Sequence, residues 1–247
     1  MLEKCEGIIL RSSSYGETNK IVTIYSKEWG KIGVMARGAK KPASRLSGIT
    51  LPFTYAYFLV QKSKGLSVLQ QGETIQSFKK IKADIFLTAY VSYMAELLDK
   101  ATEEKKPNPY LFELFLQCIE YMEEGYDAQI IMHIFEMKML TVLGITPHMQ
   151  DCVICHSSEG TFSFSLRHAG IICHACKSQD AYVLQVSDKT IRLLRVFYYF
   201  DLNRLGTISV SEQTKKEISH VLETYLIEYA GITLKTRRFL KQMDLLK

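Results

Sequence analysis

The chain has 247 residues, of which 47% are apolar, and a formal net charge of +5. This length is enough for two or three modules with hydrophobic cores of their own. No secretory apolar segment follows Met1 and no apolar run reaches the ~18 residues of a membrane span, so we exclude a membrane protein and expect a soluble, cytoplasmic one.

Charge is unevenly distributed along the chain. Residues 1–81 hold 13 Lys and Arg against 5 Asp and Glu, residues 82–150 hold 5 against 11, and residues 151–247 hold 13 against 10. A basic first region predicts contact with a polyanion, because the local field steers such ligands more than the total charge does. Attraction between the first and second regions is the alternative interpretation.

The first 80 residues show the pattern of short β-strands. Runs rich in Val, Ile, Thr, Tyr and Phe alternate with Gly, Ser and Asn. The predicted strands cover residues 5–13, 19–27, 30–38, 52–62 and 66–76. Five short strands over this length favour an OB-type barrel at residues 1–80, with an SH3-like barrel as the alternative.

From residue 81 onward, apolar residues recur with helical spacing. The predicted helices cover residues 83–102, 107–125, 127–144, 187–200, 211–231 and 236–246. Asp127 is expected to cap the third helix, and Gly144 to follow its end. We therefore predict an all-helical domain at residues 81–247, which makes the chain an α+β multidomain protein.

The segment DCVICHSSEGTFSFSLRHAGIICHACK, residues 151–177, interrupts the helices. It holds two CxxC pairs separated by 17 residues, a spacing that brings four thiolates to the corners of a tetrahedron. The predicted ligands are Cys152, Cys155, Cys173 and Cys176. We predict one structural Zn²⁺ per chain, held in a zinc ribbon or knuckle inserted at about residues 148–182. Four thiolates complete the coordination of the metal, so no position is open for catalysis.

The remaining cysteines and the nearby histidines have simpler interpretations. Cys5 and Cys118 are expected to be packing residues. Three histidines lie in or between the CxxC pairs, namely His156, His168 and His174. We expect that they do not coordinate the metal, because the four cysteines complete its shell.

The sequence offers no motif for catalysis or nucleotide binding. The nearest approach to a phosphate-binding loop is YSKEWGKI, residues 25–32, which has Tyr25 in place of the first Gly and Ile32 in place of the Ser or Thr that binds Mg²⁺. Neither GxSxG nor HExxH occurs. We therefore expect a protein that is not an enzyme and uses no nucleotide.

Basic residues gather in the loop RGAKKPASR, residues 37–45, and again in the turn at residues 62–65. Cations at this density, with aromatic faces nearby, are typical of OB folds that follow a nucleic-acid backbone. The predicted DNA contacts are Arg37, Lys40, Lys41, Arg45, Lys62 and Lys64. The candidates for base stacking are Trp29, Tyr25 and Tyr57. Filling of the barrel is the alternative role of these aromatic residues.

Two further basic groups lie in the last third of the chain. They are Lys189, Arg192 and Arg195 on one predicted helix, and Lys235, Arg237, Arg238 and Lys241 around the last one. Each group either extends a DNA-binding track or forms an ordinary exposed face and helix end.

Four segments carry a family resemblance. They are the opening GIILRSSSYGETNKIVTIYSKEWGKIGVMARGAKKPASR, the acidic helical region, the CVIC and CHAC pairs after LGITP, and the C-terminal LKTRRFL. With these segments in this order, the chain resembles the bacterial RecO family of DNA repair proteins over essentially its whole length. The resemblance implies a recombination mediator of the RecF pathway without nucleotide hydrolysis. Such a protein binds single- and double-stranded DNA, anneals complementary strands, and works with RecR to help RecA replace single-strand-binding protein.

The resemblance also implies site residues and partners. It places Arg37, Lys40, Lys41 and Arg45 in the basic barrel loop of the family, and the four cysteines of the CxxC pairs in its zinc positions. The implied partners are single- and double-stranded DNA, RecR, the C-terminal tail of single-strand-binding protein and, indirectly, RecA, in a nucleoid-associated location. The alternative function is a zinc-ribbon scaffold whose barrel and helical domain bind proteins rather than DNA.

Overall fold

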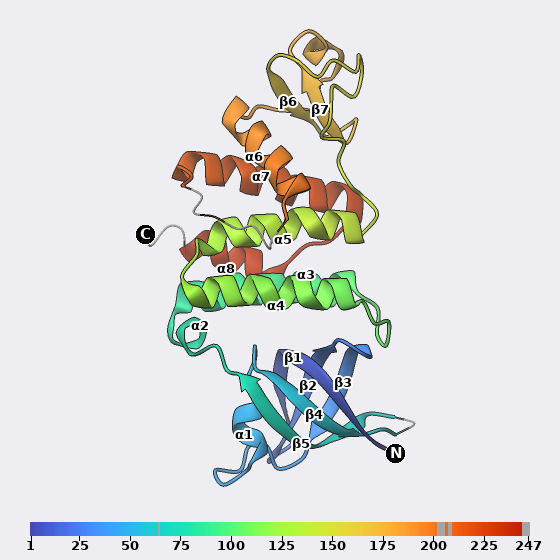
Figure 1. The fold of residues 1–247 in the computed structure, drawn as a ribbon, viewed down its shortest axis with the longest axis vertical. Coiled ribbons are helices and arrows are strands. Elements are labelled where there is room, and N and C mark those ends of the chain that lie inside the picture. The colour runs from blue at the N-terminus through green and yellow to red at the C-terminus, as the bar shows by residue number, and fades with distance from the viewer. Residues whose placement is uncertain (64, 202–205, 207–208, 244–247) are drawn as a thin grey trace. The chain divides into compact units, whose positions relative to one another are not determined.

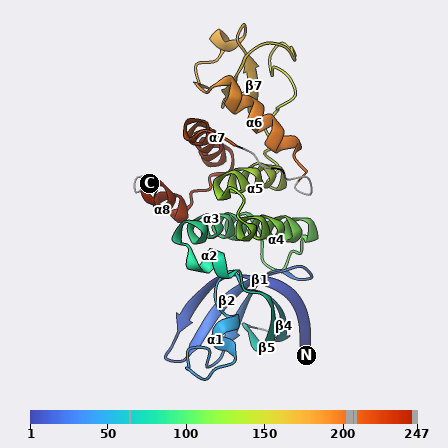
Figure 2. The same cartoon turned by 60° about the vertical axis from the view of Figure 1, so that its left-hand side comes forward.

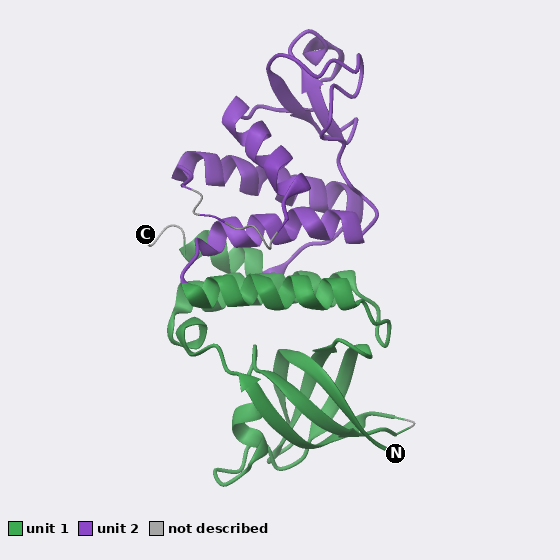
Figure 3. Ribbon diagram, viewed as in Figure 1, with its two compact units in different colours: residues 1–124, 236–247 green, residues 125–235 purple. Residues whose placement is uncertain are grey.

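The computed structural model describes residues 1–63, 65–201, 206 and 209–243 (Figure 1). Lys64, one of the predicted DNA contacts, lies outside the described residues. The chain divides into two compact units, Met1–Glu124 with Thr236–Lys247, and Gly125–Lys235 (Figure 3). The division into domains at residues 1–80 and 81–247, with an insertion at about 148–182, stays a prediction.

The first unit begins with a closed five-stranded barrel, whose strand order is β1-β2-β3-β5-β4 (Figure 1). Its strands are β1 (Leu2–Tyr15), β2 (Asn19–Ser26), β3 (Gly30–Ala36), β4 (Tyr55–Gln61) and β5 (Ser67–Gln76). A short parallel pairing of β3 with β5 closes the barrel. The five predicted strands and the OB-type class are confirmed.

The barrel core follows from alternation along the strands. On β3, every second residue is buried. Val22 and Ile24 of the neighbouring β2 and Phe58 of β4 are also fully buried and belong to the same core. The helix α1 (Leu46–Ile49) joins β3 to β4 and was not predicted, because four residues are too few to show a helical period. It packs on β5 at Gly72, where a Cβ would lie 2.2 Å from Cδ1 of Ile49.

Four further helices belong mainly to the first unit. They are α2 (Lys79–Ala83), α3 (Ile85–Ala101), α4 (Pro109–Glu124) and α8 (Lys235–Met243). α3 and α4 lie side by side (Figures 1 and 2). The carboxylate of Glu123 on α4 accepts hydrogen bonds from two backbone N–H groups at the start of α2. On α3, the carboxylate of Glu96 accepts two more from Thr236 of α8.

The barrel is fastened to the helices of its own unit by Lys31 of β3. Its ammonium lies 3.0 Å from Oδ1 of Asp99 on α3, with both side chains largely buried. Its carbonyl oxygen accepts a hydrogen bond of 2.9 Å from the backbone N–H of Lys105 in the α3–α4 connection. This connection therefore lies against β3 of the barrel.

Within its described residues, the second unit combines three α-helices with a small sheet. The helices are α5 (Ala128–Val142), α6 (Asp188–Tyr199) and α7 (Glu212–Ala230), and the sheet has the order β7-β6-β8. Its strands are β6 (Phe162–Ser165), β7 (Gly170–Cys173) and β8 (Val183–Leu184), and the 3₁₀ helix η1 (Lys177–Gln179) precedes β8.

The α5 helix forms the core of the second unit. Each residue from Ala128 to Met137 is buried, as expected for a helix that is apolar nearly all round. The side chain of Asp127 accepts hydrogen bonds from the N–H groups of Gln129 and Ile130, so the predicted N-cap is confirmed. Within the described residues, no helix is long and apolar enough to cross a membrane.

Candidate nucleic-acid interface and metal centre

The basic loop, residues 37–45, follows β3 and lies against the turn between β1 and β2. Gly38 takes a φ of +66°, which favours glycine, and its N–H donates a hydrogen bond of 2.9 Å to Oδ1 of Asn19. The backbone N–H of Lys40 donates one of 2.9 Å to the carbonyl oxygen of Thr18. The backbone of the loop is therefore held by the neighbouring hairpin.

All four predicted cations of the basic loop are exposed. They are Arg37, Lys40, Lys41 and Arg45. Across the described part of the chain, no carboxylate lies within salt-bridge distance of any of them, and only Lys40 has a side-chain hydrogen bond, to the carbonyl oxygen of Gly16. Four positive charges are thus available to an external anion.

Tyr15 is an aromatic residue at this end of the barrel that the sequence interpretation missed. It ends β1, directly before Gly16, and 50% of its surface is exposed. In the sequence, the run of three serines before Tyr15 could have indicated its exposure. The last residues of this 14-residue strand extend beyond the barrel interior. An exposed aromatic ring beside cations is the combination that single-stranded nucleic acids use.

Trp29 and Lys62 lie at the opposite end of the barrel. The β2–β3 register pairs Lys20 with Ala36 and Ser26 with Gly30, so the basic loop and the turn holding Trp29 are separated by the length of β3. At about 3.3 Å per residue, that length is about 20 Å. The predicted DNA contacts therefore form two groups rather than one.

Tyr25 is wrong as a candidate for base stacking. It is fully buried, and its ring stacks on Phe112 of α4 with centroids 6.4 Å apart. Burial raises the pKa of its phenol to about 12. Tyr57 is 36% exposed and carries the ammonium of Lys4 at 3.9 Å from its ring centroid, so its stacking role stays a prediction.

Several residues of the two later basic groups contact other parts of the protein rather than solvent. Arg237 is only 7% exposed and its guanidinium lies over the ring of Tyr93, so it is wrong as part of a surface patch. Arg195 donates to the carbonyl oxygens of Met149 and Gln150, which removes it from the patch as well. Arg192 pairs with a neighbouring carboxylate on its own helix. Lys189 and Arg238 are exposed, and their DNA contact stays a prediction.

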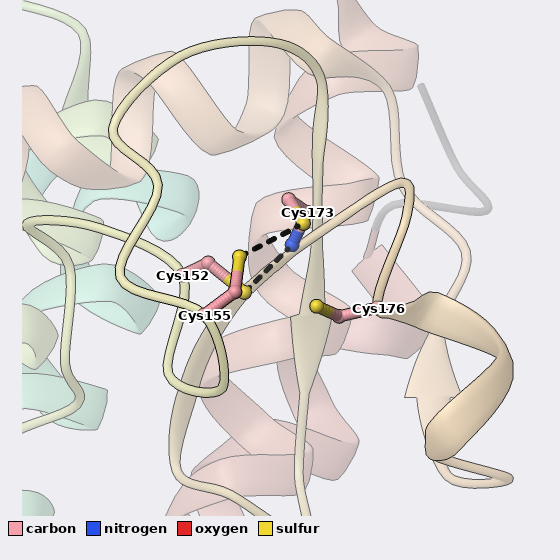
Figure 4. Close-up of side chains that lie close together, drawn as sticks. All are labelled: Cys152, Cys155, Cys173 and Cys176. Atoms are coloured by element: carbon pink, nitrogen blue, oxygen red, sulfur yellow. Dashed lines mark hydrogen bonds between the residues drawn. The ribbon is translucent and has the colours of Figure 1, made fainter.

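The sulfur atoms of the four predicted metal ligands converge. Figure 4 shows Cys152, Cys155, Cys173 and Cys176 turned toward one another, and their Sγ atoms all lie within 4.8 Å. The Sγ atoms of Cys155 and Cys173 are 3.6 Å apart. Tetrahedral zinc with Zn–S bonds of about 2.3 Å needs sulfurs about 3.8 Å apart, so the donor set fits a Zn²⁺ ion.

The two CxxC pairs are positioned by the small sheet. Cys173 ends β7, and its N–H donates a 3.3 Å hydrogen bond to Sγ of Cys152. β7 lies close to the segment of the first pair at Gly170, where a Cβ would be 2.5 Å from the carbonyl oxygen of His148. The hydrogen bond from Val153 N–H to the carbonyl oxygen of Ile171 adds a second tie.

The electrostatics of this centre favour a thiolate at Cys152, whereas the pKa values of the Cys155 and Cys176 thiols are raised. Burial opposes ionisation of Cys152, but the backbone N–H groups of Cys155, Cys173 and Ile154 outweigh it and lower the pKa of the thiol to about 6. Among the described residues, the cluster that could hold a metal contains no histidine. His148 and His156 instead contact the carboxylate of Asp151.

Known proteins match the chain over its whole length. A family model for the N-terminal part of recombination protein O matches residues 1–78, and one for the C-terminal part matches residues 82–238. DNA repair protein RecO of Bacillus subtilis (strain 168) is 56% identical over 247 residues, which are 100% of this chain and 97% of that protein. DNA repair protein RecO of Bacillus pumilus is 58% identical over 247 residues, covering 100% and 96%. That of Listeria innocua is 52% identical over 243 residues, covering 98% and 95%.

Proposed function

The chain belongs to the RecO family of DNA repair proteins, and we propose that it is a recombination mediator that binds DNA through the basic loop of its barrel. It binds single- and double-stranded DNA and anneals complementary strands. Together with RecR, it promotes loading of RecA onto DNA that is covered by single-strand-binding protein.

The observation that supports this proposal is the state of the basic loop. Arg37, Lys40, Lys41 and Arg45 are all exposed, and no carboxylate of the described residues pairs with them. Cations of this kind displace counterions from phosphates, which supplies most of the affinity and depends little on base sequence. Hydrogen bonds to the neighbouring hairpin hold the backbone of the loop, and they therefore fix the positions of these charges.

Annealing follows from the same charges. Two complementary strands repel each other through their phosphates, and a cationic surface that neutralises phosphates of both lowers that repulsion. The protein needs no nucleotide for this step, since the strands pair spontaneously once they are close. The basic loop thus brings strands together, and base pairing supplies the free energy.

In this proposal, the four cysteines of the CxxC pairs have a structural role. Cys152, Cys155, Cys173 and Cys176 would hold one Zn²⁺, which stabilises the segment around the small sheet and supplies no Lewis-acid chemistry when all four are ligands. RecR and the C-terminal tail of single-strand-binding protein are proposed partners, without an assigned surface.

An annealing assay tests the proposal. Complementary oligonucleotides, bare or coated with single-strand-binding protein, are mixed with and without the full chain in the absence of ATP, and duplex formation is followed by fluorescence. We expect faster annealing with the protein, and loss of the acceleration in the triple variant Arg37→Ala, Lys40→Ala, Lys41→Ala.

A charge-matched variant is the control for this assay. Lys79, Arg167 and Lys216 are exposed and lie outside the basic loop, so their replacement by Ala removes the same three charges elsewhere. We expect this control to anneal like the unmodified protein. Equal annealing by both triple variants would exclude the loop, and no DNA binding even at low salt would favour the scaffold that binds proteins.

A further inference from the structure

We propose that a groove beside Trp29, at the barrel end away from the basic loop, takes a nucleobase of single-stranded DNA. The bound strand then runs along the barrel from the basic loop to this groove. The inference rests on the proposed function and deepens it, because it assigns a second contact point and a preference for unpaired bases.

The groove arises where the barrel closure ends. β5 pairs with β3 only from Val34 to Ala36, so the edge of β3 from Gly30 to Gly33 has no β5 partner. A cavity of about 560 Å³ opens there between β3, the β4–β5 hairpin and the α3–α4 connection. Its lining includes Trp29, Ile32, Gly33, Val60, Lys62 and Leu66.

The far wall of the groove is held by backbone contacts. Gly30, in the turn after Trp29, has a φ of +67°, and a Cβ there would lie 2.3 Å from the carbonyl oxygen of Lys106. Beside it, the N–H of Lys105 donates to the carbonyl oxygen of Lys31. The cavity is therefore bounded on this side by backbone that contacts of the fold hold in place.

Trp29 offers the groove an aromatic face. Its indole is half-buried and packs partly against the barrel core. The ammonium of Lys62 lies 4.3 Å from the ring centroid and 2.5 Å from a carboxylate oxygen of Glu3. Exposed ion pairs of this kind are weak, so Lys62 can turn to a phosphate when a base occupies the indole face.

The charges around the groove are compatible with one strand of DNA. Lys62 and Lys105 are cations of its lining, and Glu104, which directly precedes Lys105, is an exposed carboxylate of the same lining. The carboxylate of Glu28 is already engaged, because it accepts hydrogen bonds from the N–H of Glu6 and the hydroxyl of Ser26. A phosphate at the groove can therefore contact Lys62 or Lys105. The base can stack on the indole, since every base has a π-face.

The shape of the site favours single strands over duplexes. A base in a duplex is covered by its neighbours on both faces, whereas an unpaired base can turn out of the strand. The basic loop and Trp29 are separated by about 20 Å along β3. A strand that reaches both must span several nucleotides, within the footprints known for single OB folds.

The chain itself provides the probe, because Trp29 is its only tryptophan. The full-length protein is titrated with an oligothymidylate of about 15 nucleotides, near the upper end of OB-fold footprints, and with a duplex of the same length. Binding is measured by anisotropy of labelled DNA, and Trp29 emission is recorded in parallel with unlabelled DNA. We expect the single strand to quench this emission with the same Kd as the anisotropy change, and the duplex to leave it unchanged.

Two variants complete the test. Trp29→Leu should lose between about 5-fold and about 150-fold in single-strand affinity, as expected for one stacked base, with little loss for the duplex. Gly33→Val leaves Trp29 in place and fills the groove, since a Cβ at Gly33 would meet only Cδ1 of Leu66 at 3.4 Å. It should weaken single-strand binding and abolish the quenching.

The outcomes separate this inference from the proposed function. Normal single-strand binding with unchanged Trp29 emission, or unchanged affinity in folded Gly33→Val, would overturn the groove and leave the basic loop as the DNA site. A protein that binds neither DNA at low salt would overturn both. Thermal melting of each variant checks that it is folded.

Discussion

The ammonium of Lys40 lies 3.3 Å from the carbonyl oxygen of Gly16, so a cation of the basic loop is tied to the turn between β1 and β2. Two backbone groups strengthen this tie, because Lys40 N–H donates to Thr18 and Gly38 N–H donates to the side chain of Asn19. The loop that carries the proposed DNA contacts is thus held in place by two backbone carbonyl oxygens and by the uncharged side chain of Asn19.

Replacing Asn19 by Ala tests whether this positioning contributes to binding. The change removes one hydrogen bond at the loop, of a kind that contributes about 1 kcal/mol, and leaves every cation in place. We expect single-strand affinity to fall by up to about 10-fold with the salt dependence unchanged. Anisotropy at several salt concentrations measures both quantities.

Ser13→Ala is the matched control on the same hairpin. Its hydroxyl donates to the carbonyl oxygen of Ile21 on β2 and not to the loop. We expect wild-type DNA affinity in this variant. A flatter salt dependence for Asn19→Ala would contradict the positioning role, because it would mean that fewer phosphates are neutralised in the complex.

Much of this fold was predictable from local pattern. The strands were visible because runs rich in Val, Ile, Thr, Tyr and Phe, which include Ile24 and Val34, lie between Gly, Ser and Asn residues. The α5 helix was visible because apolar residues fill it from a capping Asp127. The four cysteines were predictable because their spacing alone nearly determines a tetrahedral site.

The errors came from contacts between segments far apart in the sequence. Tyr25 points away from the barrel interior but is fully buried, and its ring stacks on Phe112, 87 positions later. Arg195 and Arg237 look like surface cations until Met149 and Tyr93 are placed beside them. Hydrophobic periodicity in the sequence indicates which side of a helix or strand a residue occupies. It does not indicate which distant segment covers that side in the fold.

Gly30 and Gly16 form a matched pair for a stability prediction. Both have positive φ, +67° and +59°, so Ala at either position costs about 1–2 kcal/mol of backbone strain. A Cβ at Gly16 meets nothing within 4 Å, whereas one at Gly30 meets the backbone of Lys106 at 2.3 Å. We expect Gly30→Ala to destabilise the protein clearly more than Gly16→Ala in urea unfolding. Equal losses would mean that the α3–α4 connection does not lie against the barrel as described.

Removal of a metal ligand should affect metal content and folding together. We expect Cys173→Ser to lose bound zinc and to melt at lower temperature, because metal-dependent folding of such segments is worth on the order of 10 kcal/mol. Elemental analysis and thermal melting measure the two effects.

Cys118→Ala is the control for the metal prediction. Cys118 is fully buried in α4, far in sequence from the CxxC pairs, and burial raises the pKa of its thiol. It should keep one zinc per chain with only a small stability loss. A metal-free preparation that melts at the same temperature as the zinc-loaded one would refute the structural role.

The stability of the second unit should depend on pH through the carboxylate of Glu217. Burial opposes its ionisation, but hydrogen bonds from the hydroxyl of Thr190 and from the N–H and hydroxyl of Ser187 outweigh this and lower its pKa from 4.5 to about 2. Folding therefore favours the carboxylate. Its stabilisation is fully present above about pH 4.5 and is lost as the pH falls toward 2.

We expect Glu217→Gln to lose about 1–2 kcal/mol of stability at pH 7, after allowance for solvent screening. The difference from the unmodified protein should shrink as the pH falls from 4.5 toward 2. Glu228→Gln on the same helix removes an exposed carboxylate and should leave stability unchanged. Urea unfolding at several pH values measures these differences, and a difference that is independent of pH would contradict the assignment.

The most direct measurement of DNA binding by the basic loop is the salt dependence of single-strand affinity. For Arg37→Ala, Lys40→Ala, Lys41→Ala, we expect the slope of log K against log salt to flatten by about 0.7 for each phosphate that is no longer neutralised, or by about 2 in total. The charge-matched variant at Lys79, Arg167 and Lys216 should keep the slope of the unmodified protein. An unchanged slope in the loop variant would contradict the assignment of the DNA site to the basic loop.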